Sequence, residues 1–239
     1  MTTTTAPPPT VATGPAVQGV TVRPLQVGDG LHVRRLFRTG LPVGRRLALA
    51  YADIVDYERQ CLDWYLTRGR PQARVAEVDG RIVGYLLPCL DHRSLDLRAG
   101  QRALRWSGRA TYRWGVGRLG REGRRFVQLR LQDEFEARRD PTRRPYPVSA
   151  LLAGRDAAVE RALIAVGDEI ATRADSPGWS YDVDVRDPAS LATLGEPGSE
   201  VALVTVHRTS SWLADTPVWR VTLARTTVPS RSPATTGSR

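Results

Sequence analysis

Short stretches of the chain alternate between apolar and polar residues or are continuously apolar, and longer stretches repeat apolar residues every three or four positions. The short patterns are typical of strands, and the longer period is typical of amphipathic helices. The strands predicted in this way are 19–25, 146–152, 180–185, 201–207 and 218–224. The helices predicted in this way are 30–40, 53–68 and 155–174. The segment Thr209–Pro217, between the last two strands, is predicted to be a loop.

A β-hairpin is the clearest local signal. Ala73–Val78 (ARVAEV) and Ile82–Leu87 (IVGYLL) read as two strands. The dipeptide Asp79-Gly80 lies between them and supplies the positive φ angles that a tight hairpin turn needs. We therefore expect these two strands to pair antiparallel.

The order of the predicted elements indicates the fold class. It runs strand, helix, helix, hairpin, strand, helix, strand, short helix, strand, strand. A strand–helix–strand unit in a mixed sheet indicates an α/β (α+β) fold with a central sheet flanked by helices. Residues 1–18 and 227–239 are rich in Thr, Pro, Ala, Ser and Gly and have too little apolar surface to pack. We expect a single domain over residues 19–226 between two disordered tails.

Composition narrows the class of protein. The 239 residues are 41% hydrophobic and 25% charged, so the chain can bury a core, and all 35 basic side chains are arginine. Two cysteines are too few for a disulfide scaffold, and no stretch approaches the roughly 18 apolar residues of a membrane span. The first twenty residues do not resemble a secretory signal. These three features lead us to expect a cytoplasmic protein. The three histidines lack the spacing of zinc ligands, so we expect no metal site.

Four segments resemble, in order, parts of one enzyme family. They are 21–37 (TVRPLQVGDGLHVRRLF), 73–91 (ARVAEVDGRIVGYLLPCLD), 151–164 (LLAGRDAAVERALI) and 184–199 (DVRDPASLATLGEPGS). The ordered set resembles the GCN5-related N-acetyltransferase (GNAT) superfamily, which transfers an acyl group from acyl-coenzyme A to an amine. The resemblance implies a GNAT-like mixed sheet, acetyl-CoA as the acyl-donor cosubstrate, and an amine of a small molecule or a protein as the acceptor.

The resemblance also implies where the coenzyme binds. The pantetheine arm would pair with the backbone of the fourth strand, at Ala150, Leu151 and Leu152. The next turn reads Arg/Gln-x-x-Gly-x-Gly/Ala in the family, and its backbone N–H groups hold the pyrophosphate. The matching residues are Arg155, Asp156, Ala157, Ala158, Val159 and Glu160. Ala158 and Glu160 depart from the family's pattern. The Glu160 carboxylate either repels the pyrophosphate or turns outward and favours the positive end of the helix.

The catalytic acid and base are less evident. Aligning Asp187 with the family's Asn places Leu194 where the family has a tyrosine, and leucine has no proton to give to the leaving thiolate. Tyr181 is a substitute candidate, with a place in the core as the alternative. Asp182 and Asp184 share one face of their predicted strand, because side chains at i and i+2 point the same way. One of them is the candidate base or amine binder, unless that face is merely exposed and acidic.

An arginine-rich insertion, residues 92–145, separates the third and fourth predicted strands. From residue 93 to residue 144 it has fifteen arginines and six acidic residues, and thus nine of the ten net positive charges. Its apolar residues suggest two amphipathic helices joined by glycines, although 126–132 (FVQLRLQ) also alternates like a strand.

Three roles remain open for this insertion. The first is a lid, which either covers an acidic or phosphorylated acceptor or is purely structural, with its aromatic residues in the core and its arginines in solvent. The second is a patch that binds nucleic acid, and the third is a contact for another macromolecule or a membrane surface. The alternative to an enzyme is a non-catalytic protein of the same fold that binds an acidic partner or nucleic acid through these arginines.

Overall fold

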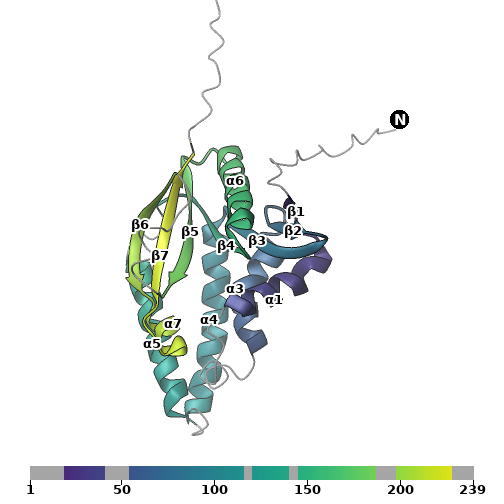
Figure 1. Ribbon diagram of the computed structural model, residues 1–239. Coiled ribbons are helices and arrows are strands. Elements are labelled where there is room, and N and C mark those ends of the chain that lie inside the picture. Colours follow the sequence, from purple (N-terminus) through teal and green to yellow (C-terminus); the bar gives the residue numbers. More distant parts are fainter. Residues whose placement is uncertain (1–18, 41–53, 116–119, 140–144, 187–197, 228–239) are drawn as a thin grey trace, which may run out of the picture.

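The computed structural model describes residues 19–40, 54–115, 120–139, 145–186 and 198–227. One seven-stranded sheet, in the order β1-β2-β3-β4-β5-β7-β6, forms the centre (Figure 1). The strands are β1 (Thr21–Pro24), β2 (Arg74–Val78), β3 (Arg81–Cys89), β4 (Val148–Gly154), β5 (Gly178–Val185), β6 (Ser199–Val206) and β7 (Trp219–Thr226). The helices are η1 (Val27–Asp29), α1 (Gly30–Gly40), α3 (Ile54–Thr67), α4 (His92–Gly115), α5 (Arg121–Arg139), α6 (Ala157–Arg173) and α7 (Arg208–Ala214). The predicted mixed sheet flanked by helices is confirmed.

The predicted hairpin is also confirmed. β2 and β3 pair antiparallel, with Val78 opposite Arg81. Asp79 and Gly80 between them have φ angles of 51° and 72°. Both angles lie in the left-handed region that this kind of two-residue turn requires, so the turn residues account for the local pairing of these two strands.

Helix α6 covers one face of the sheet. It crosses over from β4 to β5, which are parallel, as the strand–helix–strand pattern predicts. Val159 and Leu163 of α6 are fully buried against Gly84 of β3, where a Cβ would lie 2.6 Å from Val159 Cγ1. Trp179 of β5 is 1% exposed and packs on Gly167 of α6, so glycines let the helix and the sheet approach closely.

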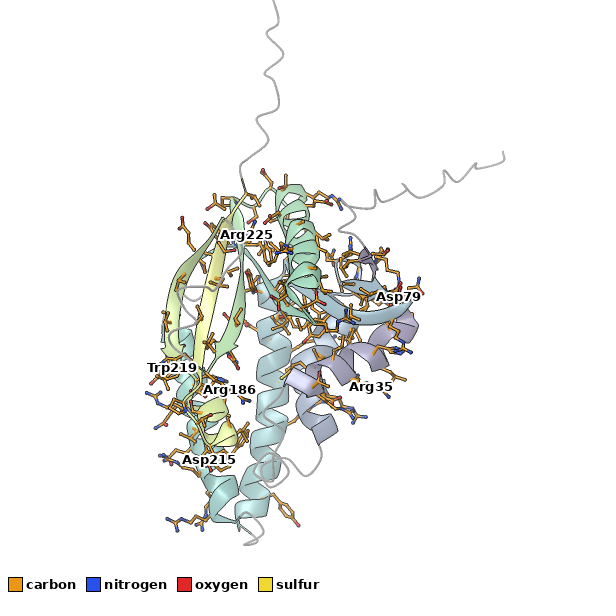
Figure 2. All side chains as sticks on the ribbon, viewed as in Figure 1. Arg35, Asp79, Arg186, Asp215, Trp219 and Arg225 are labelled. Atoms are coloured by element: carbon orange, nitrogen blue, oxygen red, sulfur yellow. The ribbon has the colours of Figure 1, made fainter. Side chains whose placement is uncertain are left out.

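Arg225 on β7 adds a polar link to α6. Its Nη2 lies 2.8 Å from Oδ2 of Asp168, and the indole N–H of Trp179 donates to Oδ1 of the same carboxylate at 2.7 Å. Figure 2 labels Arg225 at the end of β7 that lies near α6. Asp168 therefore ties α6 to both β5 and β7.

Helices α1 and α3 cover the opposite face of the sheet (Figure 1). Val33 of α1 and Leu62 of α3 are fully buried, together with Val75 of β2 and Leu87 of β3. The sheet thus lies between two apolar layers. In the part of the chain that the structure describes, none of the helices has the length and apolar character needed to cross a membrane.

The arginine-rich insertion forms two long helices, α4 and α5. Residues 126–132 lie inside α5, so the helical interpretation of this segment is confirmed and the strand suggested by its alternation is wrong. Phe126 and Leu129 are buried at a helical spacing of three, and Phe126 lies 6.0 Å from Trp212 of α7, ring centre to ring centre. Burial on a three-residue period selects the helix over the strand.

The segment Thr209–Pro217 was predicted to be a loop, and most of it is helix α7 instead. The first amides of α7 are bound by a residue that is distant in sequence. Oδ1 of Asp133 on α5 accepts from the N–H of Arg208 at 3.2 Å, and Oδ2 accepts from the N–H of Thr209 at 2.9 Å. Because a distant side chain caps this helix, the local sequence gives no capping signal for it.

Two of the sequence predictions extend beyond what the structure describes. The short helix expected within 184–199 falls mostly on residues 187–197, which include Asp187 and Leu194, and both predicted tails fall almost entirely outside the described residues. Thr227, the last described residue, is buried, and it donates from Oγ1 to the carbonyl of Ser176 at 2.8 Å.

Candidate active site

Strands β4 and β5 form a fork. They pair in parallel at three positions, ending with Ala150 opposite Tyr181. Beyond this point β4 continues to Gly154 along β3, and β5 continues to Val185 along β7. Each strand is therefore held on its outer side, while the pairing between the two has ended. An inner strand edge of this kind can bind an extended ligand through backbone hydrogen bonds.

Leu151 and Leu152 lie on the β4 arm of the fork, directly after Ala150. Leu151 pairs with Leu87 of β3, and Leu152 pairs with Leu86. The three residues predicted to hold a pantetheine arm therefore lie at the start of the fork and along its β4 side. The fold thus provides an extended backbone at the predicted position.

The turn after β4 leads directly into α6. Asp156 is the N-cap of this helix, and its Oδ1 accepts from the N–H of Val159 at 3.1 Å. Oδ2 of Asp156 lies 3.2 Å from Nε of Arg155. The hydrogen bond from Val159, supported by Arg155, holds the pKa of Asp156 below its usual range. The carboxylate of Asp156 therefore occupies one of the first-turn amides at which an anion would bind.

Glu160 lies in the first turn of α6, over the end of β4. A Cβ built on Gly154 would lie 2.5 Å from Cγ of Glu160 and 3.1 Å from its backbone nitrogen. The glycine at 154 is what allows this approach. Glu160 is half-buried, so its side chain packs along the turn that was predicted to hold the pyrophosphate.

Asp182 and Asp184 share a face of β5, as their spacing predicted, but both have partners on β7. Oδ1 of Asp182 accepts from the hydroxyl of Thr222 at 2.8 Å. The carboxylate of Asp184 is bound by Arg220, with Nε–Oδ1 at 2.9 Å and Nη2–Oδ2 at 3.2 Å. Asp182 therefore has a neutral partner, whereas Asp184 has a cationic one.

Tyr181 lies on the other face of β5. Its ring stacks on Trp179 with centroids 5.1 Å apart, and the residue is 4% exposed within the core under α6. Neighbouring residues of a strand point to opposite faces, so Tyr181 and Asp182 do not share one surface. The packing of Tyr181 is that of a core residue, which is the alternative left open by the sequence.

A histidine that the sequence did not connect to this region lies beside Asp184. His207 is 7% exposed, its Nδ1 is hydrogen-bonded to Oγ of Ser210, and its Nε2 lies 3.6 Å from Oδ2 of Asp133. Oγ of Ser210 donates to Oδ2 of Asp184 at 3.4 Å. The imidazole thus lies between a carboxylate of the insertion and a carboxylate of the sheet.

The charges in this cluster act on Asp184. Burial opposes its ionisation, but Arg220 outweighs that effect, with contributions from His207 and Ser210, so the pKa of Asp184 is lowered from its usual value. A carboxylate with a lowered pKa holds a proton weakly and is a poor general base. The ion pair with Arg220 thus gives Asp184 a structural partner, whereas the hydrogen-bond partner of Asp182 is the Thr222 hydroxyl.

Sequence reasoning missed His207, Ser210, Arg220 and Asp133 because they come from three different segments, α5, the start of α7 and β7. The signal that was available is the period-two pattern of 218–224, which places Arg220 and Thr222 on one face of their strand. The register that sets them opposite Asp184 and Asp182 is a property of the folded sheet.

Solved structures share this architecture, although no family model and no curated protein sequence matches the chain. The chain is similar to a protein named SsHAT, with a TM-score of 0.52, 20% identity, and coverage of 88% of this chain and 99% of the other. It is also similar to the apo form of a mutant agmatine N-acetyltransferase, with a TM-score of 0.50, 12% identity, and coverage of 87% and 99%. The yncA protein from Salmonella typhimurium, solved with its cofactor acetyl-CoA, has a TM-score of 0.48, 12% identity, and coverage of 91% and 99%. The chain has the GNAT fold, as the sequence resemblance implied.

Proposed function

We propose that the protein is an N-acyltransferase that moves an acyl group, in the first instance acetyl from acetyl-CoA, to an amine. The observation that carries this proposal is the fork, where β4 and β5 stop pairing after Ala150 and Tyr181 while both strands continue. A thioester arm that lies along β4 would bring its carbonyl carbon close to the face of β5. Holding an amine and a thioester at attack distance can supply a large part of the rate enhancement for such a reaction.

Asp182 is the residue that we propose binds the amine and takes its proton. It lies one residue beyond the last β4–β5 pair, and its described partner is the neutral hydroxyl of Thr222. In the reaction the amine nitrogen bonds to the acyl carbon, the carbon–sulfur bond breaks, and the amine proton passes to Asp182. Asp184, bound by Arg220, keeps the neighbouring strand positions in place. Because Tyr181 packs in the core, the thiolate takes its proton from solvent.

The backbone of Ala150, Leu151 and Leu152 is proposed to hold the pantetheine arm. These residues need no particular side chain for that role, because the N–H and C=O groups of a strand edge make the bonds. The likeness to an agmatine N-acetyltransferase supports an amine as the acceptor. The acceptor is therefore proposed to be an amine of a small molecule or of a protein.

The test is an assay of thiol release with acetyl-CoA and a panel of amines, followed by mass spectrometry of the acetylated product. Glu200→Gln is a matched control, because Glu200 is an exposed carboxylate on the edge strand β6. The proposal predicts amine-dependent thiol release that the control variant retains. Thiol release at the same rate without any amine, or none with any amine, contradicts it.

A second candidate function is a non-catalytic binder of an acidic partner. The observation in its favour is a group of exposed arginines at the start of α5, namely Arg121, Arg124 and Arg125. Binding to a polyanion such as heparin or RNA would then fall steeply with salt, and replacing the three arginines by glutamine would weaken it. The control replaces three exposed arginines elsewhere in the chain, Arg35, Arg68 and Arg81, so that net charge changes equally. Equal loss in both triple variants would contradict a specific site on α5.

A further inference from the structure

One anion-binding amide at the start of α6 is taken by the protein's own carboxylate. The N–H of Val159 donates to Oδ1 of Asp156 at 3.1 Å, and the next amide, that of Glu160, makes the first backbone bond of the helix, to the carbonyl of Asp156 at 3.0 Å. A helix N-terminus binds phosphate through amides that have no other partner. A phosphate that entered here would first have to displace the carboxylate of Asp156.

The charges of the turn also oppose a phosphate. Residues 154–160 include one cation, Arg155, and two carboxylates, Asp156 and Glu160. Arg155 already lies 3.2 Å from Asp156, and Glu160 packs against Gly154 at the entrance to the turn. Like charges repel at close range, so the carboxylates of Asp156 and Glu160 both act against a doubly charged pyrophosphate bound in this turn.

The fork, in contrast, has no such obstacle in its backbone. Beyond Ala150, β4 bonds to β3 on its outer side, and β5 bonds to β7 on its outer side. The amide groups of a pantetheine arm are uncharged and can bond to an extended strand edge. The two parts of the expected donor site therefore differ. The fork fits a pantetheine arm, whereas the turn at residues 154–160 repels a pyrophosphate.

We infer that the donor is recognised through its pantetheine thioester arm, and that Asp156 and Glu160 exclude the pyrophosphate from recognition. This inference rests on the proposed acyl transfer. The substrate class is an acylated pantetheine, whether it comes from free acyl-CoA or from the single-phosphate arm of a carrier protein.

The test compares donors with and without the pyrophosphate. The ratio of kcat/KM for acetyl-CoA to that for acetyl-pantetheine is expected to be below about threefold in the native protein. In the double variant Asp156→Gly with Glu160→Gly, freed amides and lost charges should raise this ratio about tenfold. A native ratio above about a hundredfold, or an unchanged ratio in the double variant, overturns the inference.

A second variant keeps the experiment decisive if the glycines destabilise α6. Asp156→Asn with Glu160→Gln removes both charges and keeps a good N-cap, so the ratio should rise about threefold. Asp175→Asn with Glu200→Gln is the matched control, because both residues are exposed carboxylates outside this turn. A rise of the same size in the control overturns the role of Asp156 and Glu160.

Binding separates a failure of this inference from a failure of the proposed function. If no amine supports turnover, calorimetry with coenzyme A and with pantetheine still tests donor recognition. Similar affinities for the two support the inference, whereas much tighter binding of coenzyme A, or binding of neither, overturns it.

An acetylated carrier protein is the third donor. A higher kcat/KM than with acetyl-pantetheine assigns the source to a carrier protein, an equal value assigns it to the free thioester, and both support pantetheine recognition.

Discussion

Asp184 and Arg220 lie opposite each other on β5 and β7 and form a two-point ion pair, with Nε–Oδ1 at 2.9 Å and Nη2–Oδ2 at 3.2 Å. Two positions towards the fork, the register sets Asp182 opposite Thr222. The same strand pair therefore neutralises one carboxylate with a cation and leaves the other with a neutral partner. In the proposed reaction, this difference gives Asp184 a supporting role and Asp182 the chemical role.

The first prediction concerns these two aspartates. Asp182→Asn should lower kcat by about a hundredfold or more, because it removes the proton acceptor while the amide still accepts from Thr222. Asp184→Asn should change kcat by less than about tenfold. Steady-state kinetics with the amine that gives turnover provide the measurement. A larger loss in Asp184→Asn than in Asp182→Asn would reverse the two assignments.

The second prediction concerns the pH dependence of stability. The pKa of Asp184 is lowered in the folded state, so its ionised form stabilises the fold above the usual aspartate pKa, and that contribution disappears as the pH falls through the lowered value. Because the side chain is 38% exposed, water screens the pair and the contribution is about 0.5–1 kcal/mol. The native protein should exceed Asp184→Asn in unfolding free energy at pH 7, and the difference should vanish in strong acid. A difference that grows as the pH falls would contradict this sign.

The third prediction concerns how the insertion is attached. Asp133→Ala removes the acceptor for two amides of α7 and the carboxylate beside His207, so it should destabilise the protein by about 1–2 kcal/mol. Asp133→Asn, which keeps an acceptor, should cost less. Gln132→Ala is the control, since Gln132 is the exposed neighbour on the same helix. Urea unfolding gives the measurement, and equal effects of Asp133→Ala and Gln132→Ala would show that the cap contributes nothing.

The fourth prediction concerns the contact between α6 and the sheet. In Gly167→Ala the new methyl group would overlap the ring of Trp179, which is 1% exposed and cannot move away easily. Overpacking of this kind costs about 1–3 kcal/mol. Gly100→Ala in α4 meets no atom within 4 Å, so it should be neutral or stabilise the helix by up to about 1 kcal/mol. A stabilised Gly167→Ala would contradict the close packing described for α6.

The sequence predicts those elements whose signals are local. Asp79-Gly80 specifies a turn, and alternation places Asp182 and Asp184 on one face, and both predictions are confirmed. Helix α7 escapes prediction because Asp133, far away in sequence, caps it. The partners Thr222 and Arg220 depend on the register between β5 and β7, which is set by the packing of the whole sheet.

Asp156 lies between the features that the local sequence predicts and those that only the folded structure shows. An aspartate just before a helical pattern is a common N-cap signal, so its bond to Val159 was accessible from sequence. The resemblance to the family placed the same residue in a coenzyme-binding turn instead. The two interpretations differ because a residue at a helix N-terminus can either leave the amides to a ligand or bind them itself.

The measurement that tests the central claim most directly is an amide NMR titration of protein labelled with ¹⁵N-leucine. Either acetyl-CoA or acetyl-pantetheine is added, and the signals of Leu151 and Leu152 on β4 are compared with that of Leu66 on α3. If the fork holds the pantetheine arm, Leu151 and Leu152 shift in a saturable way with either ligand, and Leu66 does not. Saturable shifts that leave both β4 leucines unchanged, or no shifts at all, would contradict a donor site between β4 and β5.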